Sequence, residues 1–342
     1  DGKITKRCEP QDPGNLENPG NLENPGNPEN PGNPENPGNP ENPENPENLE
    51  MIGRTVSHYR VVGKLGVGGM GVVYDAEDER LSRRVALKFL SEELADDPDA
   101  TRRLRREAQT IALLNHPNIC TVYEVDDHDG RTFIAMERLD GTTLKVYMAR
   151  KTLETSEIAD IAGQIAEALG VAHGKNVIHR DIKPGNIFIG DHGRVKVLDF
   201  GLARRLPTPD DSGIGMEGST IPGRPLGTAS YMAPERILQM PLDARSDLFS
   251  LGVVIYEMAT GRLPFTGAST GETVTNILEK DATPLTKLSP DRPRKLERIV
   301  DTLLTKRADG RYQSAEELQR DLSSLKKRSR PLGRILGRLR QK

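Results

Sequence analysis

The stretch HRDIKPGN occupies residues 179–186, and DFG follows it at residues 199–201. Together they place an acid, a cation and a carboxamide in one short loop, and a second acid about one hairpin further along the chain. Asp181 can orient an attacking hydroxyl and accept its proton, while Lys183 can neutralise charge on a phosphoryl group as it moves. A DFG triplet alone occurs often by chance, whereas this loop and DFG in this order rarely do. The two motifs therefore indicate an active site for group transfer.

Two residues of these motifs also suit a divalent metal ion. Asn186 and Asp199 carry oxygen ligands, which Mg²⁺ prefers and which Mn²⁺ also accepts. A metal ion held there would bridge the phosphates of a nucleotide. The sequence therefore predicts phosphoryl transfer from a nucleotide with Mg²⁺, or alternatively Mn²⁺, bound by Asn186 and Asp199.

The chain has three parts of unlike composition. Residues 1–50 are dominated by Asn, Pro, Gly and Glu, residues 51–325 carry nearly all of the apolar periodicity, and the tail from residue 326 is rich in Lys and Arg. The net charge of −3 over 342 residues sums an acidic head and a basic tail, and it argues against general nucleic-acid binding. The middle part is long enough for one large domain or two small ones.

The chain has two cysteines, Cys8 and Cys120, and this small number argues against a disulfide framework. No apolar run approaches the roughly 20 residues that span a bilayer, and the N-terminus has none of the features of a signal peptide. These features predict a cytoplasmic location. Cys120 is expected to lie in the core of a strand and not to act as a reactive thiol.

The head repeats the triplets PGN, LEN and PEN from Pro13 to Asn48. Its regular prolines exclude a helix, and it has no apolar face to bury. An extended, disordered segment is therefore expected, and collagen is excluded because glycine does not occupy every triplet. An interaction tail and translated upstream repeat DNA are the alternatives. Met51, just before the first patterned segment, is favoured as the natural start.

A glycine-rich segment lies near the start of the patterned region. Residues 59–65 are expected to form a strand, and GVGGMGVV at 66–73 matches the pattern GxGxxGxV. A Rossmann turn would be followed by a helix, but residues 72–78 and 83–90 are strand-like. The glycines are therefore expected in a β-hairpin, where backbone amides can lie over phosphates without obstruction by side chains.

The motif VALK at residues 85–88 distinguishes a nucleotide site from a plain glycine-rich hairpin. Lys88 ends an apolar strand, where a lone lysine would be costly to bury. Residues 99–114 are rich in strong helix formers, and Glu107 lies on this expected helix. The sequence therefore predicts an ion pair between Lys88 and Glu107, which would hold the lysine on the α- and β-phosphates.

A hinge is expected where two further strands end. Residues 119–137 are predicted to form these strands around the turn HDG, and Asp140 and Gly141 then lead into a second region. A hinge at this point would offer backbone N–H and C=O groups to an adenine ring, with Met136 at the border of the pocket.

With these motifs, the chain resembles the protein kinase superfamily, and in particular the bacterial eukaryotic-like (Hanks-type) Ser/Thr kinases. The resemblance extends from about Tyr59 to Leu325 and rests on GVGGMGVV, VALK, HRDIKPGN, DFG, GTASYMAPE and SDLFSLG in the expected order. It implies an α+β, two-lobed protein-kinase-like fold. A small antiparallel β lobe with one main helix is expected over residues 59–138, and a larger, mostly helical lobe over residues 141–325.

The resemblance also implies the members of the site. The expected catalytic residues are Asp181, Lys183 and Lys88. The nucleotide is expected to contact the glycine-rich turn, the strands beside it, the hinge and the metal ligands, namely Leu65, Gly66, Val67, Gly68, Gly69, Gly71, Val73, Ala86, Lys88, Glu107, Met136, Glu137, Leu139, Asn186 and Asp199.

GTASYMAPE at residues 227–235 resembles the end of a kinase activation segment. Thr228 together with Lys183 is the arrangement of Ser/Thr kinases, so Ser and Thr hydroxyls of proteins are the expected acceptors. Glu235 is expected to form a buried ion pair with Arg311.

Two more residues take structural roles from the resemblance. Asp247 in SDLFSLG resembles the residue that braces the backbone of the catalytic loop, and His179 is expected to pack against DFG. The other histidines show no metal-ligand spacing, and they are His58, His116, His128, His173 and His192.

Arg180, next to Asp181, resembles the arginine of kinases that are controlled by phosphorylation of the activation loop. A phosphate on that loop would pair with the arginine. The loop at residues 204–226 has no apolar periodicity and is expected to be mobile until phosphorylated. The preferred autophosphorylation sites are Ser219 and Thr220, followed by Thr208 and Ser212.

The tail at residues 326–342 is basic, with an apolar stripe at helical spacing made by Leu332, Ile335, Leu336 and Leu339. A disordered, solvated tail is favoured, and contact with an anionic membrane surface or an acidic partner is the alternative. A homodimer formed through the small lobe is a further option from the resemblance.

The sequence thus predicts an active Ser/Thr protein kinase that uses ATP and acts on protein substrates. The alternatives are a catalytically inactive pseudokinase, acting as an interaction module, and a kinase of a small molecule. A pseudokinase usually lacks the lysine, the catalytic acid or the metal-binding acid, and this chain has all three.

Overall fold

The computed structural model describes residues 51–68, 71–90, 111–200 and 229–326. All of them belong to the compact unit Pro40–Lys342. Several predictions concern residues outside these ranges, namely the head 1–50, Gly69, most of the helix predicted at 99–114 with Glu107, the loop 204–226 with its four hydroxyl residues, Thr228 and the tail from residue 327.

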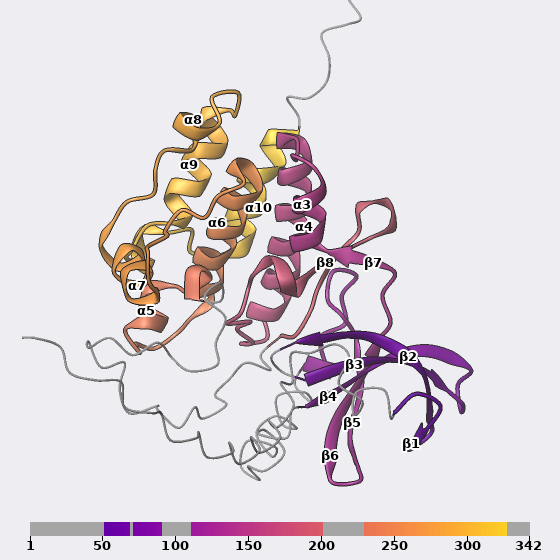
Figure 1. The fold of residues 1–342 in the computed structure, drawn as a ribbon. Coiled ribbons are helices and arrows are strands. Elements are labelled where there is room, and N and C mark those ends of the chain that lie inside the picture. Colours follow the sequence, from indigo (N-terminus) through magenta and orange to yellow (C-terminus); the bar gives the residue numbers. More distant parts are fainter. Residues whose placement is uncertain (1–50, 69–70, 91–110, 201–228, 327–342) are drawn as a thin grey trace, which may run out of the picture. The chain divides into compact units, whose positions relative to one another are not determined.

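The N-terminal part is one antiparallel sheet of six strands (Figure 1). The spatial order is β1-β2-β3-β4-β6-β5, so β6 lies between β4 and β5 although it follows β5 in the sequence. The strands are β1 (Thr55–Val56), β2 (Tyr59–Gly68), β3 (Gly71–Asp78), β4 (Arg83–Leu90), β5 (Val122–His128) and β6 (Arg131–Glu137). The small antiparallel β lobe predicted from the sequence is confirmed.

One face of this sheet carries its own apolar core. Alternate residues of a strand point to opposite faces, and Val72 and Tyr74 of β3 share a face with Leu87 and Phe89 of β4, which lie opposite them. The aromatic rings on this face meet in pairs, with the centroids of Phe89 and Phe133 5.7 Å apart. Burial of this face leaves the other face of the sheet for a second set of contacts.

The glycine-rich hairpin depends on one glycine in particular. Gly71 has φ 127°, a conformation that other residues rarely adopt. A Cβ atom at this position would lie 1.8 Å from the carbonyl oxygen of Phe89. β3 can therefore begin this close to the end of β4 only with glycine at residue 71.

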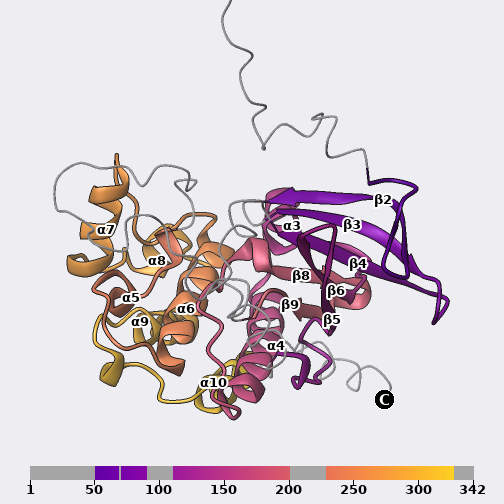
Figure 2. The same cartoon turned by 90° about the horizontal axis from the view of Figure 1, so that it is seen from below.

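The C-terminal part is mainly helical, with a small three-stranded sheet in the order β7-β8-β9 (Figures 1 and 2). The strands are β7 (Gly141–Thr143), β8 (Ile187–Gly190) and β9 (Val195–Val197). The α-helices are α3 (Leu144–Arg150), α4 (Thr155–His173), α5 (Pro234–Ile237), α6 (Ala244–Thr260), α7 (Thr270–Glu279), α8 (Leu285–Leu288), α9 (Arg294–Leu303) and α10 (Ala315–Lys326). Short 3-10 turns are η2 (Pro184–Asn186), η3 (Asp191–Gly193), η4 (Ala229–Tyr231) and η5 (Ala308–Gly310).

Helix α6 is the centre of the helical part, and it packs against α4, α8 and α9. It begins at the N-cap Asp243, whose side chain accepts the N–H of Arg245, and ends at Gly261 in the left-handed conformation. A Cβ atom at Gly252 would lie 2.6 Å from the Cβ of Leu303, so the glycine allows α9 to approach closely. Within the described ranges, none of the helices has the length and apolar character needed to cross a membrane.

The segment before β5 joins the two parts of the fold through the backbone. Ile119 and Val197 form a parallel bridge. The N–H of Cys120 donates to the Val197 carbonyl at 3.0 Å, and the N–H of Val197 donates to the Asn118 carbonyl at 2.8 Å. Cys120 is buried as predicted, but it lies just before β5 and not within the strand. Through these bonds the entry to β5 is fixed to β9, the strand that leads to Asp199.

The buried ion pair predicted between Glu235 and Arg311 is confirmed. It is bidentate, with distances of 2.8 Å from Nη1 to Oε1 and 2.9 Å from Nη2 to Oε2. Ser246 also donates to Glu235, at 2.6 Å. Burial alone would raise the pKa of Glu235, but the bonds from Arg311 and Ser246 outweigh burial and hold this pKa below its usual range. The pair fixes α5 to the segment between η5 and α10.

Arg311→Met should therefore destabilise the fold. Its side chain is fully buried, and the substitution would leave the Glu235 carboxylate without its charged partner. We expect the free energy of unfolding to fall by about 3 kcal/mol, the range for breaking a buried ion pair, measured by urea denaturation. The control is Arg307→Met, which removes an exposed pair with Asp309 and should leave the free energy of unfolding nearly unchanged. Equal effects of the two variants would contradict this role for Arg311.

Candidate active site

The catalytic loop brings three predicted residues together. The amide nitrogen of Asn186 donates to the backbone oxygen of Asp181 at 2.9 Å and to its Oδ2 at 2.8 Å. Lys183 Nζ lies 2.8 Å from the same Oδ2. The acid, the cation and the carboxamide predicted from HRDIKPGN therefore form one hydrogen-bonded cluster.

The backbone of this loop is held by Asp247 of α6, as the sequence predicted. Its Oδ2 accepts the N–H of His179 at 2.8 Å, and its Oδ1 accepts the N–H of Arg180 at 2.7 Å. Arg180 has φ 68°, in the left-handed region that non-glycine residues rarely occupy. Two hydrogen bonds to a buried carboxylate therefore stabilise a strained backbone directly before Asp181.

His173, at the end of α4, also belongs to this network. Its Nε2 lies 2.8 Å from Asp247 Oδ2, and its side chain is 10% exposed. The sequence indicates no role for this residue, because its spacing fits no metal site and nothing in its local pattern points to Asp247, which lies 74 positions away. Only the approach of α4 to α6 brings the two together.

His179 takes the structural role predicted for it. Its side chain is completely buried, its ring centroid lies 4.6 Å from that of Phe200, and its Nε2 lies 2.8 Å from the carbonyl oxygen of Leu198. These contacts support the segment that carries Asp199. The Nδ1 of His179 accepts the backbone N–H of Asp181 at 3.2 Å, so both ring nitrogens of His179 bind backbone groups of the site.

Lys88 and Asp199 form an ion pair across the two parts of the fold. Lys88 Nζ lies 2.8 Å from Asp199 Oδ2, and both side chains are largely shielded from solvent. Burial alone would raise the pKa of Asp199, but the Lys88 ammonium outweighs it and holds this pKa below its usual range. The predicted partner of Lys88, Glu107, lies outside the described residues, so the pairing of Lys88 with Glu107 stays a prediction.

The residues predicted to contact the nucleotide share one face of the N-terminal sheet. Val73 lies opposite Lys88 in the ladder between β3 and β4, and Ala86 lies opposite Met136 in the ladder between β4 and β6. Residues opposite each other point to the same face, and so do residues two apart in a strand. These four side chains therefore lie on the face away from the aromatic core.

The remaining predicted positions lie at the edges of this face. Leu65 and Val67 are exposed on β2, and Gly66 and Gly68 face Val73 and Gly71 in the glycine-rich hairpin. Glu137 ends β6, and Leu139, half-buried, follows it in the hinge. The sheet thus brings the glycine-rich hairpin, the Lys88 strand and the hinge into one surface.

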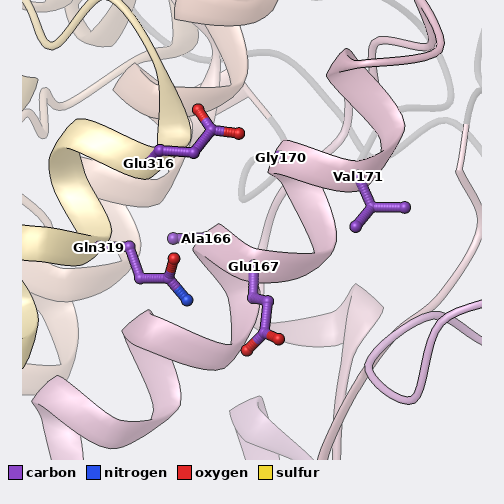
Figure 3. A pocket seen from close by; sticks show the side chains of 6 residues that line it. All are labelled: Ala166, Glu167, Gly170, Val171, Glu316 and Gln319. Atoms are coloured by element: carbon purple, nitrogen blue, oxygen red, sulfur yellow. The ribbon is translucent and has the colours of Figure 1, made fainter.

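A separate hollow lies between α4 and α10 (Figure 3). Figure 3 shows Glu316 and Gln319 of α10 opposite α4, with Glu316 towards Gly170 and Gln319 towards Ala166. None of its six lining residues belongs to the predicted site. The hollow is therefore a packing feature of α4 and α10.

An antiparallel sheet with a glycine-rich hairpin and a buried lysine, joined to a helical part that holds the acid loop, defines an α+β fold of the two-lobed kinase class. The chain belongs to the protein kinase domain family, whose sequence model matches residues 59–323. Families of this kind use ATP and a divalent metal ion.

Named relatives and a solved structure agree with this assignment. The chain is 36% identical over 276 residues to the serine/threonine-protein kinase PrkC of Bacillus subtilis, covering 80% of this chain and 41% of PrkC. It is 39% identical over 263 residues to PknB of Mycolicibacterium smegmatis, covering 75% of this chain and 41% of PknB. The crystal structure of the PknI kinase domain of Mycobacterium tuberculosis matches with a TM-score of 0.64 and 28% identity, over 80% of this chain and 97% of that one. The chain thus spans about two fifths of the length of PrkC and PknB.

The Lys88–Asp199 pair gives a pH-dependent stability. The pKa of Asp199 is lowered in the folded protein, so its contribution is present above about pH 4 and is lost as the pH falls through the folded pKa. We expect Lys88→Met to lower the free energy of unfolding by about 2 kcal/mol at neutral pH. This difference should shrink as the pH falls below about 4 and through the lowered pKa of Asp199, because Asp199 then becomes protonated in the folded protein too.

The measurement is urea denaturation of both proteins over a pH series. Lys151→Met is the control, since it removes an exposed pair with Glu157, at 2.8 Å, away from the site. A difference between the wild type and Lys88→Met that stays constant with pH would show that the lysine does not stabilise the fold through Asp199.

Proposed function

We propose that this protein is an active Ser/Thr protein kinase, which transfers the γ-phosphoryl group of ATP to Ser and Thr hydroxyls of proteins. The observation that carries the proposal is the pair of acids, each fixed by its own lysine. Asp181 is paired with Lys183, and Asp199 with Lys88, at 2.8 Å in both cases. Phosphoryl transfer requires this combination of acids and cations in fixed positions.

The residues of the loop divide the chemistry between them. Asp181, held by Asn186 and Lys183, accepts the proton of the substrate hydroxyl and orients its oxygen. Lys183 stabilises negative charge on the group that is transferred. Lys88, on the same face of the sheet as Val73 and Ala86, holds the phosphates of the nucleotide.

The donor set fits Mg²⁺. The amide nitrogen of Asn186 donates to Asp181, so its Oδ1 is the atom left to act as an oxygen ligand. Lys88 contacts Oδ2 of Asp199, which leaves Oδ1 of that carboxylate. Carboxylate and amide oxygens are hard ligands of the kind that Mg²⁺ prefers. A Mg²⁺ ion held by Asn186 and Asp199 would neutralise charge on the nucleotide phosphates.

The acceptor is proposed to be a protein hydroxyl because PrkC and PknB are named serine/threonine-protein kinases and the loop of this chain has a lysine at residue 183. An inactive pseudokinase is the second candidate class. Lys88, Asp181 and Asp199 are all present, and each forms an ion pair in the site. This favours an active enzyme over a pseudokinase. A cytoplasmic location, a homodimer and a membrane contact of the tail stay predictions from the sequence.

Asp181→Asn and Lys88→Met should each lower phosphate transfer to a generic protein substrate by about 10²-fold or more, because each removes a charge that acts on the reacting groups. The measurement is transfer of radiolabelled phosphate from ATP, with and without Mg²⁺. Lys151→Met, whose pair with Glu157 lies outside the site, should retain wild-type activity. Full activity of either site variant would refute the catalytic assignment, and a wild type that binds ATP without transfer would identify a pseudokinase.

We further propose that the enzyme is activated by autophosphorylation between residues 204 and 226, with Ser219 and Thr220 preferred and Thr208 or Ser212 next. The basis is Arg180, which precedes Asp181 and would pair with a phosphate. Mass spectrometry after incubation with ATP should find phosphate in this segment, and Asp181→Asn should abolish it. Phosphorylation confined to sites outside 204–226 would overturn the proposal.

A further inference from the structure

Two consecutive residues at the end of β6 are held by ion pairs with different parts of the fold. Glu137 Oε2 lies 2.6 Å from Nζ of Lys196, which belongs to β9. The backbone N–H of Thr121 donates to the same oxygen at 3.3 Å. Lys196 also donates to the carbonyl oxygen of Ile119 at 3.1 Å. Glu137 is thereby tied to the strand that leads to Asp199 and to the segment that pairs with this strand.

Arg138 pairs with the N-terminal sheet instead. Its Nε donates to Oδ2 of Asp75 in β3 at 3.3 Å, and its Nη1 donates to Asp140, at the start of the C-terminal part. Asp75 is buried and also accepts a hydrogen bond from Nε of Arg84, at 3.0 Å. Arg84, Asp75, Arg138 and Asp140 thus form a row of alternating positive and negative side chains, each paired with the next.

These pairs act on the backbone between them. Successive side chains of an extended segment point in opposite directions, so Glu137 and Arg138 restrain the hinge from two sides. The Lys196–Glu137 pair is partly shielded, with side chains 13% and 27% exposed, and is therefore screened less by salt than a surface pair. Its formation leaves the backbone of the hinge fewer conformations.

We propose that Lys196, and on the other side Asp75, are positioning residues for the nucleotide. They hold Glu137 and Arg138 so that the backbone groups of residues 137–139 are preorganised to bind the base. A preorganised backbone binds the base more tightly, because its conformational entropy is lost when the protein folds and not when ATP binds. The inference rests on the proposed function, in which ATP is the substrate, and on the sequence-based prediction that the hinge backbone binds the base. It adds charged side chains that do not themselves touch the nucleotide.

The principal test is Lys196→Met, which keeps the length of the side chain and removes its charge. We expect the KM for ATP and the dissociation constant of ATP to rise about fivefold, with kcat within about twofold of wild type, because the chemistry at Asp181 is unchanged. Lys196→Arg keeps the charge and should recover most of the affinity. Arg138→Met removes the contact with Asp75 and should raise the KM and the dissociation constant for ATP in the same way.

Lys151→Met is the matched control, because it breaks another Lys–Glu pair, between α3 and α4, with side chains 46% and 27% exposed. Its KM for ATP should equal that of the wild type. Circular dichroism spectra and thermal unfolding of all variants establish that they are folded. If Lys196→Met and Lys151→Met have the same affinity for ATP, or if Lys196→Met lowers kcat without changing KM, the positioning role is overturned.

A second measurement separates this inference from the proposed function. Hydrogen exchange of the backbone amides of residues 137–141 in the nucleotide-free protein should become faster in Lys196→Met and stay unchanged in Lys151→Met. A wild type that binds no ATP would refute the proposed function alone, while unchanged exchange in Lys196→Met would refute the restraint on the hinge.

Discussion

The carboxylate of Asp247 is the constraint on which the rest of the site depends. It lies almost completely buried in the first turns of α6 and accepts two backbone N–H groups of the catalytic loop. Arg180, one of the two donors, has a left-handed backbone that costs about 1–3 kcal/mol. Hydrogen bonds to a charged acceptor contribute about 1.5–3 kcal/mol each, which is enough to offset that cost. The position of Asp181 therefore depends on the packing of α6, which holds the backbone before it, as well as on Lys183 and Asn186 of its own loop.

The same dependence on packing appears in the N-terminal sheet. Its strands alternate, so the aromatic core uses one face and Val73, Ala86 and Lys88 use the other. Lys88 can be buried on that second face because Asp199 lies opposite it. The pairing of residues 118–120 with β9 fixes the strand that leads to Asp199 in this position. The buried lysine and the joining of the two parts of the fold thus depend on one another.

The sequence predicted those features that a motif or a repeat period encodes. Strand-like segments and the resemblance to protein kinases predicted the sheet, and the same resemblance predicted the pair of Glu235 with Arg311 and the role of Asp247. It did not predict that His173 binds Asp247 or that Lys196 binds Glu137. These partners are 74 and 59 positions apart, and no local period relates them. Such contacts arise only when separate elements pack, so composition and spacing carry no signal of them.

Asp181 and Asp199 each use one carboxylate oxygen for contacts within the protein. Asp181 uses Oδ2 for Lys183 and Asn186, and Asp199 uses Oδ2 for Lys88. Among the described residues, neither acid has a hydrogen bond to its Oδ1. One oxygen of each carboxylate thus fixes the side chain within the fold, and the other is left for a substrate hydroxyl or a metal ion. Because each acid is paired with a lysine, the site can bury two carboxylates together at a cost far below that of isolated charges.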